Sequence, residues 1–309
     1  GGNRMPPLGA NERDRVGESL IADWIAELAR FQPPSRLLNL AARAQVGSGS
    51  DLLIPGFVIA GAPRAVLVRA IGPTLRDFGV ADALNAPVLT LFDADSNPIA
   101  QNTRWATAPN RDAVQGAMSR LGAFGLAENS GDSAIFMTLS PGAYTAQTAG
   151  ENGSTGVALV EIYEDGVGSR PGAIPPGGRL VNTAVRARVG TGANVLIPGL
   201  VVSEGAPKTV LIRAVGPGLE AFGVSGVLGQ PVVTLFAGPE AFVSNAGWNH
   251  AANANEIRAA AVRVGAFPLT EGGRDSAMLV SLSPGPYTIQ VSGANLTSGV
   301  ALVEVYEVP

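Results

Sequence analysis

The chain contains no cysteine among its 309 residues and only one histidine, His250. The missing cysteine excludes disulfides, thiol catalysis and zinc–thiolate sites, and it leaves the cellular compartment open. Lys208 is the only lysine, so the glycine-rich stretches "VGSGSD" and "VGTGAN" lack the lysine of a phosphate-binding loop. These absences exclude thiol and zinc–thiolate chemistry and a phosphate-binding loop at these two stretches.

Charge and long apolar runs are also scarce. Charged residues make up 15% of the chain, the net charge is −4 and the isoelectric point is about 5.2. We therefore expect no nucleic-acid partner and no attraction to an anionic membrane surface. The run "LLIPGFVIAGA" is interrupted by Pro55, Gly56 and Gly61 and is far shorter than the roughly 20 apolar residues of a membrane-spanning helix. No basic-then-apolar signal opens the sequence, so we expect any export signal to have been removed or to lie upstream.

Glycine and proline, in contrast, are abundant, at 40 and 23 residues. They favour many short strands joined by tight turns over a helical fold. In "RAVLVRAIG", Val66, Val68 and Ala70 would lie on one face, and Leu67 and Ile71 on the other. This alternation with a period of two is typical of a strand.

Most of the chain consists of two similar sequence repeats. The stretch that starts "RLLNLAARAQVGSGSDLLIPG" at Arg36 aligns with "RLVNTAVRARVGTGANVLIPG" at Arg179, and "VALVEIYE" at 157–164 returns as "VALVEVYE" at 300–307. We predict a first repeat at 36–164, a Gly/Pro-rich linker at 165–178 and a second repeat at 179–309. Seven or eight short strands per repeat predict an all-β chain of two tandem β-sandwich domains, Ig-like or jelly-roll-like. The first strand of a repeat, such as 36–46, could lie at a sheet edge and add to the sheet of a neighbouring molecule.

One short helix interrupts the strands of each repeat. Val114, Ala117, Met118 and Leu121 lie at helical spacing, as do Ile257, Ala260, Ala261 and Val264. We expect Asn110 in the first repeat, and Asn253 or Asn255 in the second, to cap these helices.

The amino-terminal extension, residues 1–35, has a different pattern. Val16, Leu20, Trp24, Leu28 and Phe31 form one apolar stripe at helical spacing. We predict an amphipathic helix that docks on the chain's own sandwich or on a neighbouring molecule, because one such helix is not stable alone.

The repeats and the amino-terminal extension each resemble a known family. The repeats, with "R-L-x-N", "V-G-[ST]-G", "R-A-x-G-P" and "[TS]-G-V-A-L-V-E-x-Y", resemble the tandem β-sandwich repeats of large secreted bacterial surface proteins. That resemblance implies secretion or surface display and no particular reaction. The first 30 residues, "RMPPLGANERDRVGESLIADWIAEL" among them, are similar to the end of a c-type cytochrome module, in which Met5 would be the axial ligand. The haem-attachment motif C-x-x-C-H is absent, so we expect no haem in this chain.

Catalytic candidates are few. His250 lies in the loop "GWNHAANAN" without a serine elbow, and the first repeat has Thr107 at the aligned position, which favours a solvated histidine. Ser133 and Ser276, in "GDSA" and "RDSA", are better explained as loop-to-strand junctions than as nucleophiles.

Recurring charged residues have a structural interpretation. Asp132 and Asp275 precede strands, where a carboxylate commonly accepts backbone N–H bonds. Glu161 and Glu304 recur in the middle of apolar strands, and Arg69 and Arg213 recur in "VLVRAIGP" and "VLIRAVGP". We predict that each repeat pairs its arginine with its own glutamate across neighbouring strands.

Two binding alternatives stay open. Asp93, Asp95 and Asn97 alternate as in some calcium loops, but no glutamate follows at the twelfth position, and a hairpin turn needs the same residues. Trp105 and Trp248 recur and would stack on a sugar ring if they were exposed, whereas a tryptophan at a sandwich edge is more often half-buried.

We therefore assign no catalytic, cofactor-binding or metal-ligating residue. The sequence favours a non-enzymatic extracellular or cell-surface protein that self-assembles into a filament, tube or layer, with copies of itself as partners. The alternative is a carbohydrate-binding or adhesive module whose partners are cell-surface glycans.

Overall fold

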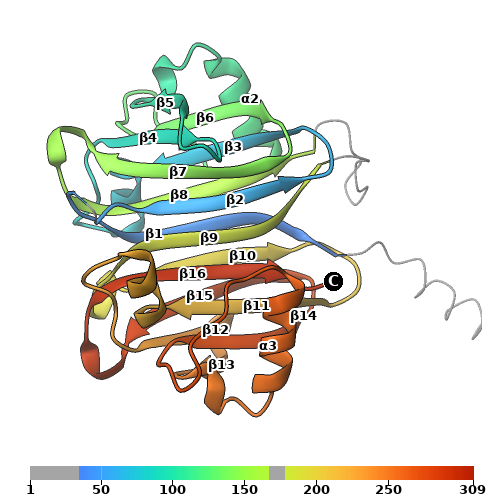
Figure 1. Cartoon of the computed structure of the whole chain (residues 1–309). Coiled ribbons are helices and arrows are strands. Elements are labelled where there is room, and N and C mark those ends of the chain that lie inside the picture. Colours follow the sequence, from blue (N-terminus) through green and yellow to red (C-terminus); the bar gives the residue numbers. More distant parts are fainter. Residues whose placement is uncertain (1–34, 50, 167–177) are drawn as a thin grey trace, which may run out of the picture.

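The computed structural model describes residues 35–49, 51–166 and 178–309. The helix predicted within residues 1–35 and most of the linker predicted at 165–178 lie outside these ranges. The described chain is mostly antiparallel β-sheet with few short helices (Figure 1), which confirms the predicted β-rich class.

The two repeats contain the same elements in the same order. Repeat 1 comprises β1 (Leu37–Val46), β2 (Ile54–Ala60), β3 (Arg64–Ile71), β4 (Pro87–Phe92), β5 (Pro98–Asn102), α2 (Arg111–Arg120), β6 (Ser133–Leu139), β7 (Gly142–Gly150) and β8 (Gly156–Asp165). Repeat 2 comprises β9 (Arg179–Val189), β10 (Ile197–Val202), β11 (Lys208–Val215), β12 (Pro231–Ala237), β13 (Glu240–Asn245), α3 (Ala254–Arg263), β14 (Ser276–Leu282), β15 (Gly285–Gly293) and β16 (Gly299–Glu307). The prediction of seven or eight strands per repeat is met with eight in each.

Backbone pairing crosses from one repeat to the other. One run of strands has the order β6-β3-β8-β1-β10-β15-β12-β13, and the other has the order β14-β11-β16-β9-β2-β7-β4-β5. Both runs begin in one repeat and end in the other, through β1–β10 and β9–β2 (Figure 1). The repeats are thus related by an approximate two-fold axis, and each supplies half of each run.

This pairing corrects the proposal that the segment 36–46 is an edge strand for another molecule. β1 lies between β8 and β10, with Leu40 opposite Ile162 on one side and opposite Leu200 on the other. Both sides of its backbone are therefore used within the chain. β9 is placed in the same way, between β16 and β2.

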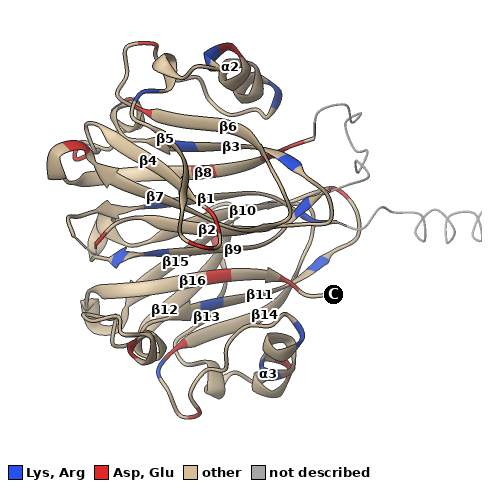
Figure 2. Cartoon of the chain, turned by 45° about the horizontal axis from the view of Figure 1, so that its top comes forward, with Lys and Arg blue, Asp and Glu red and all other residues tan. Residues whose placement is uncertain are grey.

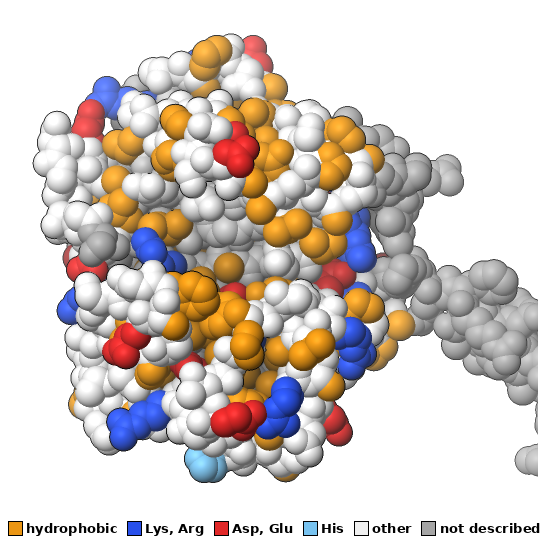
Figure 3. Space-filling view, viewed as in Figure 1, with side chains coloured by type: hydrophobic (Ala, Val, Ile, Leu, Met, Phe, Trp, Pro, Cys, Tyr) orange, Lys and Arg blue, Asp and Glu red, His pale blue; other side chains and the backbone are white. Residues whose placement is uncertain are grey.

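The largest apolar cluster lies between the two runs and continues through the junction. It includes Leu40, Phe57, Leu89, Val185 and Leu200, from strands of both repeats, and all of them are buried. Much of the apolar composition is therefore used inside the chain, because alternate residues of nearly every strand point into this core. Outside the described core, apolar side chains are scattered over the visible face of both halves (Figure 3).

The short helices cover the outer faces of the two runs. α2 packs against β3 and β6, and α3 packs against β11 and β14. Asn110 and Asn253 stand at the predicted cap positions, but neither side chain caps its helix. Their amide groups donate instead to the carbonyls of Phe136 and Leu279, and so tie each helix to the strand beneath it. No helix within the described ranges has the length and apolar character of a membrane span.

Candidate functional site

The serines that could suggest a hydrolase are structural. Ser133 and Ser276 are buried at the first positions of β6 and β14, and their hydroxyls donate to the carbonyls of Pro87 at 2.6 Å and Pro231 at 2.7 Å. The interpretation of both residues as loop-to-strand junctions is confirmed. His250 is exposed at the end of a short turn, 248–250, as expected for a solvated histidine.

The recurring aspartates hold backbone N–H groups, as predicted. Asp132 accepts from the amide of Gly72 at 2.7 Å, and Asp275 accepts from that of Gly216 at 2.8 Å. These glycines are required by close packing, because a Cβ on Gly72 would lie 2.1 Å from the carbonyl oxygen of Leu84. The repeated "R-A-x-G-P" motif thus encodes a tight crossing stabilised by a buried carboxylate.

The stretch 93–97 forms a turn. Asp93 accepts from the amides of Asp95 at 3.0 Å and Asn97 at 2.9 Å, and also from the side-chain amide of Asn97. The backbone hydrogen bond from Asn97 lowers the pKa of the Asp93 carboxyl below its usual value. The turn interpretation is confirmed, since its polar groups are used to close the hairpin between β4 and β5.

Trp105 and Trp248 do not form a sugar-binding platform. Trp105 is 1% exposed and Trp248 is 3% exposed, beneath α2 and α3 respectively. Each indole N–H donates to a backbone carbonyl, that of Ala127 at 3.0 Å and that of Thr270 at 3.3 Å. The proposed stacking of these two residues on a glycan is therefore wrong, because the helices cover their rings.

The predicted arginine–glutamate pairs are present in both repeats. Arg69 on β3 lies directly opposite Glu161 on β8, and its Nε donates to the Glu161 carboxylate at 3.0 Å. Arg213 on β11 lies opposite Glu304 on β16, again with 3.0 Å between Nε and Oε2. In Figure 2 blue and red segments lie near each other on β3 and β8 and on β11 and β16, and the other charged residues of these strands are at the strand ends.

Aromatic rings enclose each of these pairs. The guanidinium of Arg69 lies 4.4 Å from the ring centre of Phe124, and that of Arg213 lies 4.2 Å from that of Phe267. A tyrosine two residues after each glutamate donates its hydroxyl to the carboxylate, at 2.9 Å from Tyr163 and 2.7 Å from Tyr306. Burial raises the pKa of both tyrosines, which keeps their hydroxyls protonated as donors.

The pair in repeat 2 gives a pH prediction. Burial raises the pKa of Glu304 above its usual 4.5, although Arg213 and Tyr306 lower it in part. An acid whose pKa is raised by folding binds more protons in the folded state, so its contribution to stability is lost as pH rises. The free energy of unfolding of the parent minus that of Glu304→Gln should therefore fall as pH increases above 4.5. Urea titrations at a series of pH values measure this difference, and a difference that increased with pH would show a lowered pKa instead.

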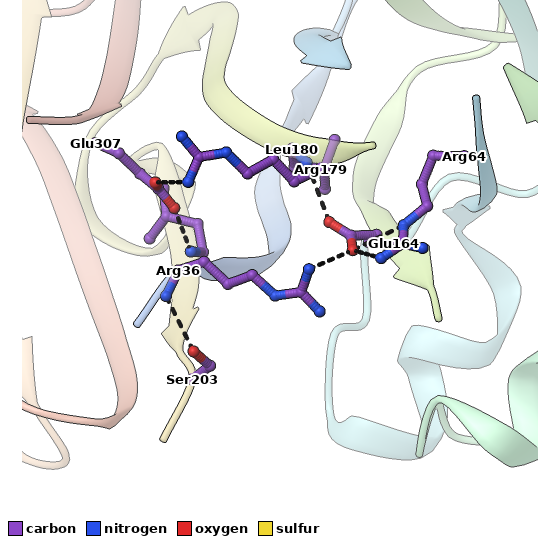
Figure 4. A network of polar contacts seen from close by, with 8 residues as sticks. Arg36, Arg64, Glu164, Arg179, Leu180, Ser203 and Glu307 are labelled. Atoms are coloured by element: carbon purple, nitrogen blue, oxygen red, sulfur yellow. Dashed lines mark hydrogen bonds and ion pairs between the residues drawn. The ribbon is translucent and has the colours of Figure 1, made fainter. Parts of the chain in front are cut away.

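A second charged cluster joins the two repeats, and we call it the clasp (Figure 4). Glu164 at the end of β8 accepts from Arg64 at 2.8 Å and from Arg36 at 2.9 Å. Its other oxygen accepts from the backbone amide of Leu180, the second residue of β9, at 3.0 Å. A carboxylate of repeat 1 therefore holds the first strand of repeat 2.

Repeat 2 makes the equivalent contact with repeat 1. Glu307 at the end of β16 accepts from the backbone amide of Leu37, the first residue of β1, at 2.6 Å. Arg179 lies 3.3 Å and Lys208 lies 3.2 Å from its other oxygen. Thus the only lysine of the chain occupies the position that Arg64 has in repeat 1, and both repeats are held reciprocally.

Comparison with known proteins gives no family. No family model and no curated protein matches the chain. Among solved structures, the chain is similar to the tandem CBM51 modules of a family 98 glycoside hydrolase from Streptococcus pneumoniae, at 7% identity, with 86% of this chain and 83% of that chain covered and a TM-score of 0.24. It is also similar to a DUF4785 family protein from Legionella pneumophila, at 7% identity, 97% and 88% coverage and a TM-score of 0.22. A mutant of Bacillus subtilis oxalate decarboxylase is similar at 10% identity, 88% and 72% coverage and a TM-score of 0.16. None of these likenesses is close enough to indicate a function.

Proposed function

We propose that the chain is a non-enzymatic structural module of an extracellular or cell-surface protein, built from two β-sandwich units that associate with copies of the same chain. The observation that supports this proposal most strongly is the repetition of exposed aromatic side chains. Phe78 and Phe222 occupy equivalent positions in the two repeats, and each is 63% exposed. Aromatic side chains, phenylalanine among them, are enriched in the cores of protein–protein interfaces.

Both phenylalanines are held in a fixed orientation. The ring of Phe78 packs against that of Phe124 with 5.2 Å between centres, and the ring of Phe222 packs against that of Phe267 with 5.1 Å between centres. Phe124 and Phe267 are the rings that lie over the buried arginines. An exposed ring that is already ordered loses little conformational freedom when a partner covers it.

The outermost strands add a second repeated feature. Ile99 on β5 and Phe242 on β13 are exposed at equivalent positions, and within the described residues each of these strands pairs with one other strand only. A strand with a free edge can add to the sheet of another molecule. β5 and β13 lie at opposite ends of the molecule (Figure 1), so the free edges stand at two poles.

Two equivalent poles favour a linear assembly. A contact between one pole of one molecule and a pole of the next leaves a second pole free on each of them. Such a contact propagates without closing, which generates a filament. The charge-poor surface supports association, because few like charges have to be brought together.

The double variant Phe78→Ser, Phe222→Ser tests this proposal. We expect it to weaken self-association by at least about tenfold, because burying one aromatic ring contributes about 1.5–3 kcal/mol. Light scattering over a concentration series measures the change in mass. Leu296→Ser is the matched control, since Leu296 is also exposed but has Gly153 at its position in repeat 1. A parent chain that stayed monomeric at high concentration, or a double variant that assembled like the parent, would refute the proposal.

Carbohydrate binding is the alternative function. The two side chains that the sequence suggested for sugar stacking, Trp105 and Trp248, are both buried. A glycan array distinguishes the two functions, since a structural module should show no saccharide affinity.

A further inference from the structure

Repeat 2 contains a cavity of about 240 Å³ between α3 and the residues that follow it. Trp248, Ile257, Ala261 and Leu269 give it a mostly apolar lining, and the buried Arg213 also contributes to the lining. Arg258, Val262 and Glu271 line it as well, and these three are exposed, so the cavity opens to solvent beside α3.

The same place in repeat 1 is built differently. Met118 on α2 corresponds to Ala261 on α3, and the thioether sulfur of Met118 lies 3.5 Å from Nη1 of Arg69. The hollow that remains beside α2 has Met118 in its lining and does not reach Arg69. In repeat 1 the thioether of Met118 therefore lies between the hollow and the arginine, whereas in repeat 2 the shorter alanine leaves the buried arginine as part of the cavity wall.

The hydrogen bonds of the two arginines show the consequence. Nη1 of Arg69 has two partners, the carbonyl of Phe124 at 2.5 Å and the sulfur of Met118. Nη1 of Arg213 has, within the described residues, only the carbonyl of Phe267, at 2.6 Å. The Nε side of each guanidinium faces its glutamate, with Nε of Arg213 at 3.0 Å from Oε2 of Glu304 and Nε and Nη2 of Arg69 bound to Glu161. The two repeats therefore differ at Nη1, where Arg213 lacks the second acceptor that Met118 gives to Arg69.

We propose that this cavity is a binding site for a small uncharged apolar molecule that carries one hydrogen-bond acceptor, such as an aromatic ketone, aldehyde or thioether. The apolar part lies against Trp248 and Ile257, and the acceptor takes the place that the Met118 sulfur has in repeat 1. A ligand of this size is reasonable, since a dry apolar cavity of about 150 Å³ binds benzene in another protein.

The ion pair between Arg213 and Glu304 determines which charge a ligand in this cavity can carry. Arg213 is already compensated by Glu304, whose Oε2 lies 3.0 Å from Nε. A carboxylate bound beside Arg213 would bring a second anion close to Glu304 without a second buried cation, which is unfavourable in a desolvated site. An uncharged acceptor avoids this repulsion. The site does not depend on self-association, and either proposal can fail alone.

Three probes of similar shape test the site: acetophenone, which has an acceptor, ethylbenzene, which has none, and benzoate, which is charged. Titration calorimetry on the full chain should show acetophenone binding about tenfold more tightly than ethylbenzene, because a hydrogen bond to a charged group is among the stronger ones. Benzoate should bind more weakly than acetophenone. Equal affinities for acetophenone and ethylbenzene, or no binding of acetophenone, would overturn the proposal.

Exchanging the two side chains provides the matched controls. Ala261→Met should reduce the preference for acetophenone over ethylbenzene to about one, because the introduced thioether covers Arg213. Met118→Ala should raise the number of acetophenone sites from one to two by exposing Arg69 in the same way. A full preference retained in Ala261→Met, with the fold verified by circular dichroism, would contradict the assignment even if Met118→Ala did not fold.

Discussion

Replacing Glu164 with glutamine should lower the free energy of unfolding by about 3–5 kcal/mol, the usual cost of leaving one side of a buried ion pair without its partner. The carboxylate is buried, and its two oxygens accept from Arg36, Arg64 and the Leu180 amide. An amide has one acceptor oxygen, so its NH₂ group must face either the guanidinium groups or the Leu180 N–H. Denaturant titration measures the loss.

Glu128→Gln is the control for this variant. Glu128 also pairs with an arginine, Arg111, but both side chains are exposed. Exposed pairs contribute between 0 and about 1 kcal/mol, so this change should be nearly neutral. If Glu164→Gln were as mild as Glu128→Gln, the clasp would not contribute to holding the repeats together.

Glu161→Gln should cost a similar amount, about 3–5 kcal/mol, for a different reason. Arg69 is completely buried, and its charge would lose its only anionic partner within the described residues. Replacing both members by apolar residues, as in Arg69→Met with Glu161→Met, should recover most of the loss, because no charge then remains buried.

An exposed ion pair of repeat 2, Arg258 with Glu271, gives the control for Glu161→Gln. The change Glu271→Gln should be nearly neutral. The measurement is the midpoint of urea unfolding for the two single variants and the double variant. If Glu161→Gln unfolded at the parent midpoint, the pair would have no role in stability.

Local pattern was sufficient for much of the architecture. The Arg69–Glu161 pair could be predicted because both residues recur in strands of fixed register, and two residues at the same height of neighbouring strands meet. The strands themselves follow from alternation, and Ser133 and Asp132 follow from their place at a strand start. These features depend on residues within one repeat.

The missed features depend on contacts between the repeats or on what covers a residue. Leu37 and Glu307 are 270 positions apart, and nothing in either segment indicates that they meet. Glu164 looks like an ordinary polar residue at a strand end. The signal that could have found the clasp is the joint recurrence of Arg36 with Arg179 and of Glu164 with Glu307. Similarly, the burial of Trp105 depends on how α2 lies over it, which the spacing of the helix residues does not determine.

The pairing of the two repeats through β1–β10 and β2–β9 makes the described residues one continuous β-structure with two equivalent poles. Scanning calorimetry of the unaltered chain tests it directly. We expect a single transition whose calorimetric enthalpy equals its van't Hoff enthalpy. Neither repeat can unfold without losing its strand pairing with the other repeat. Two separable transitions, one for each repeat, would contradict it.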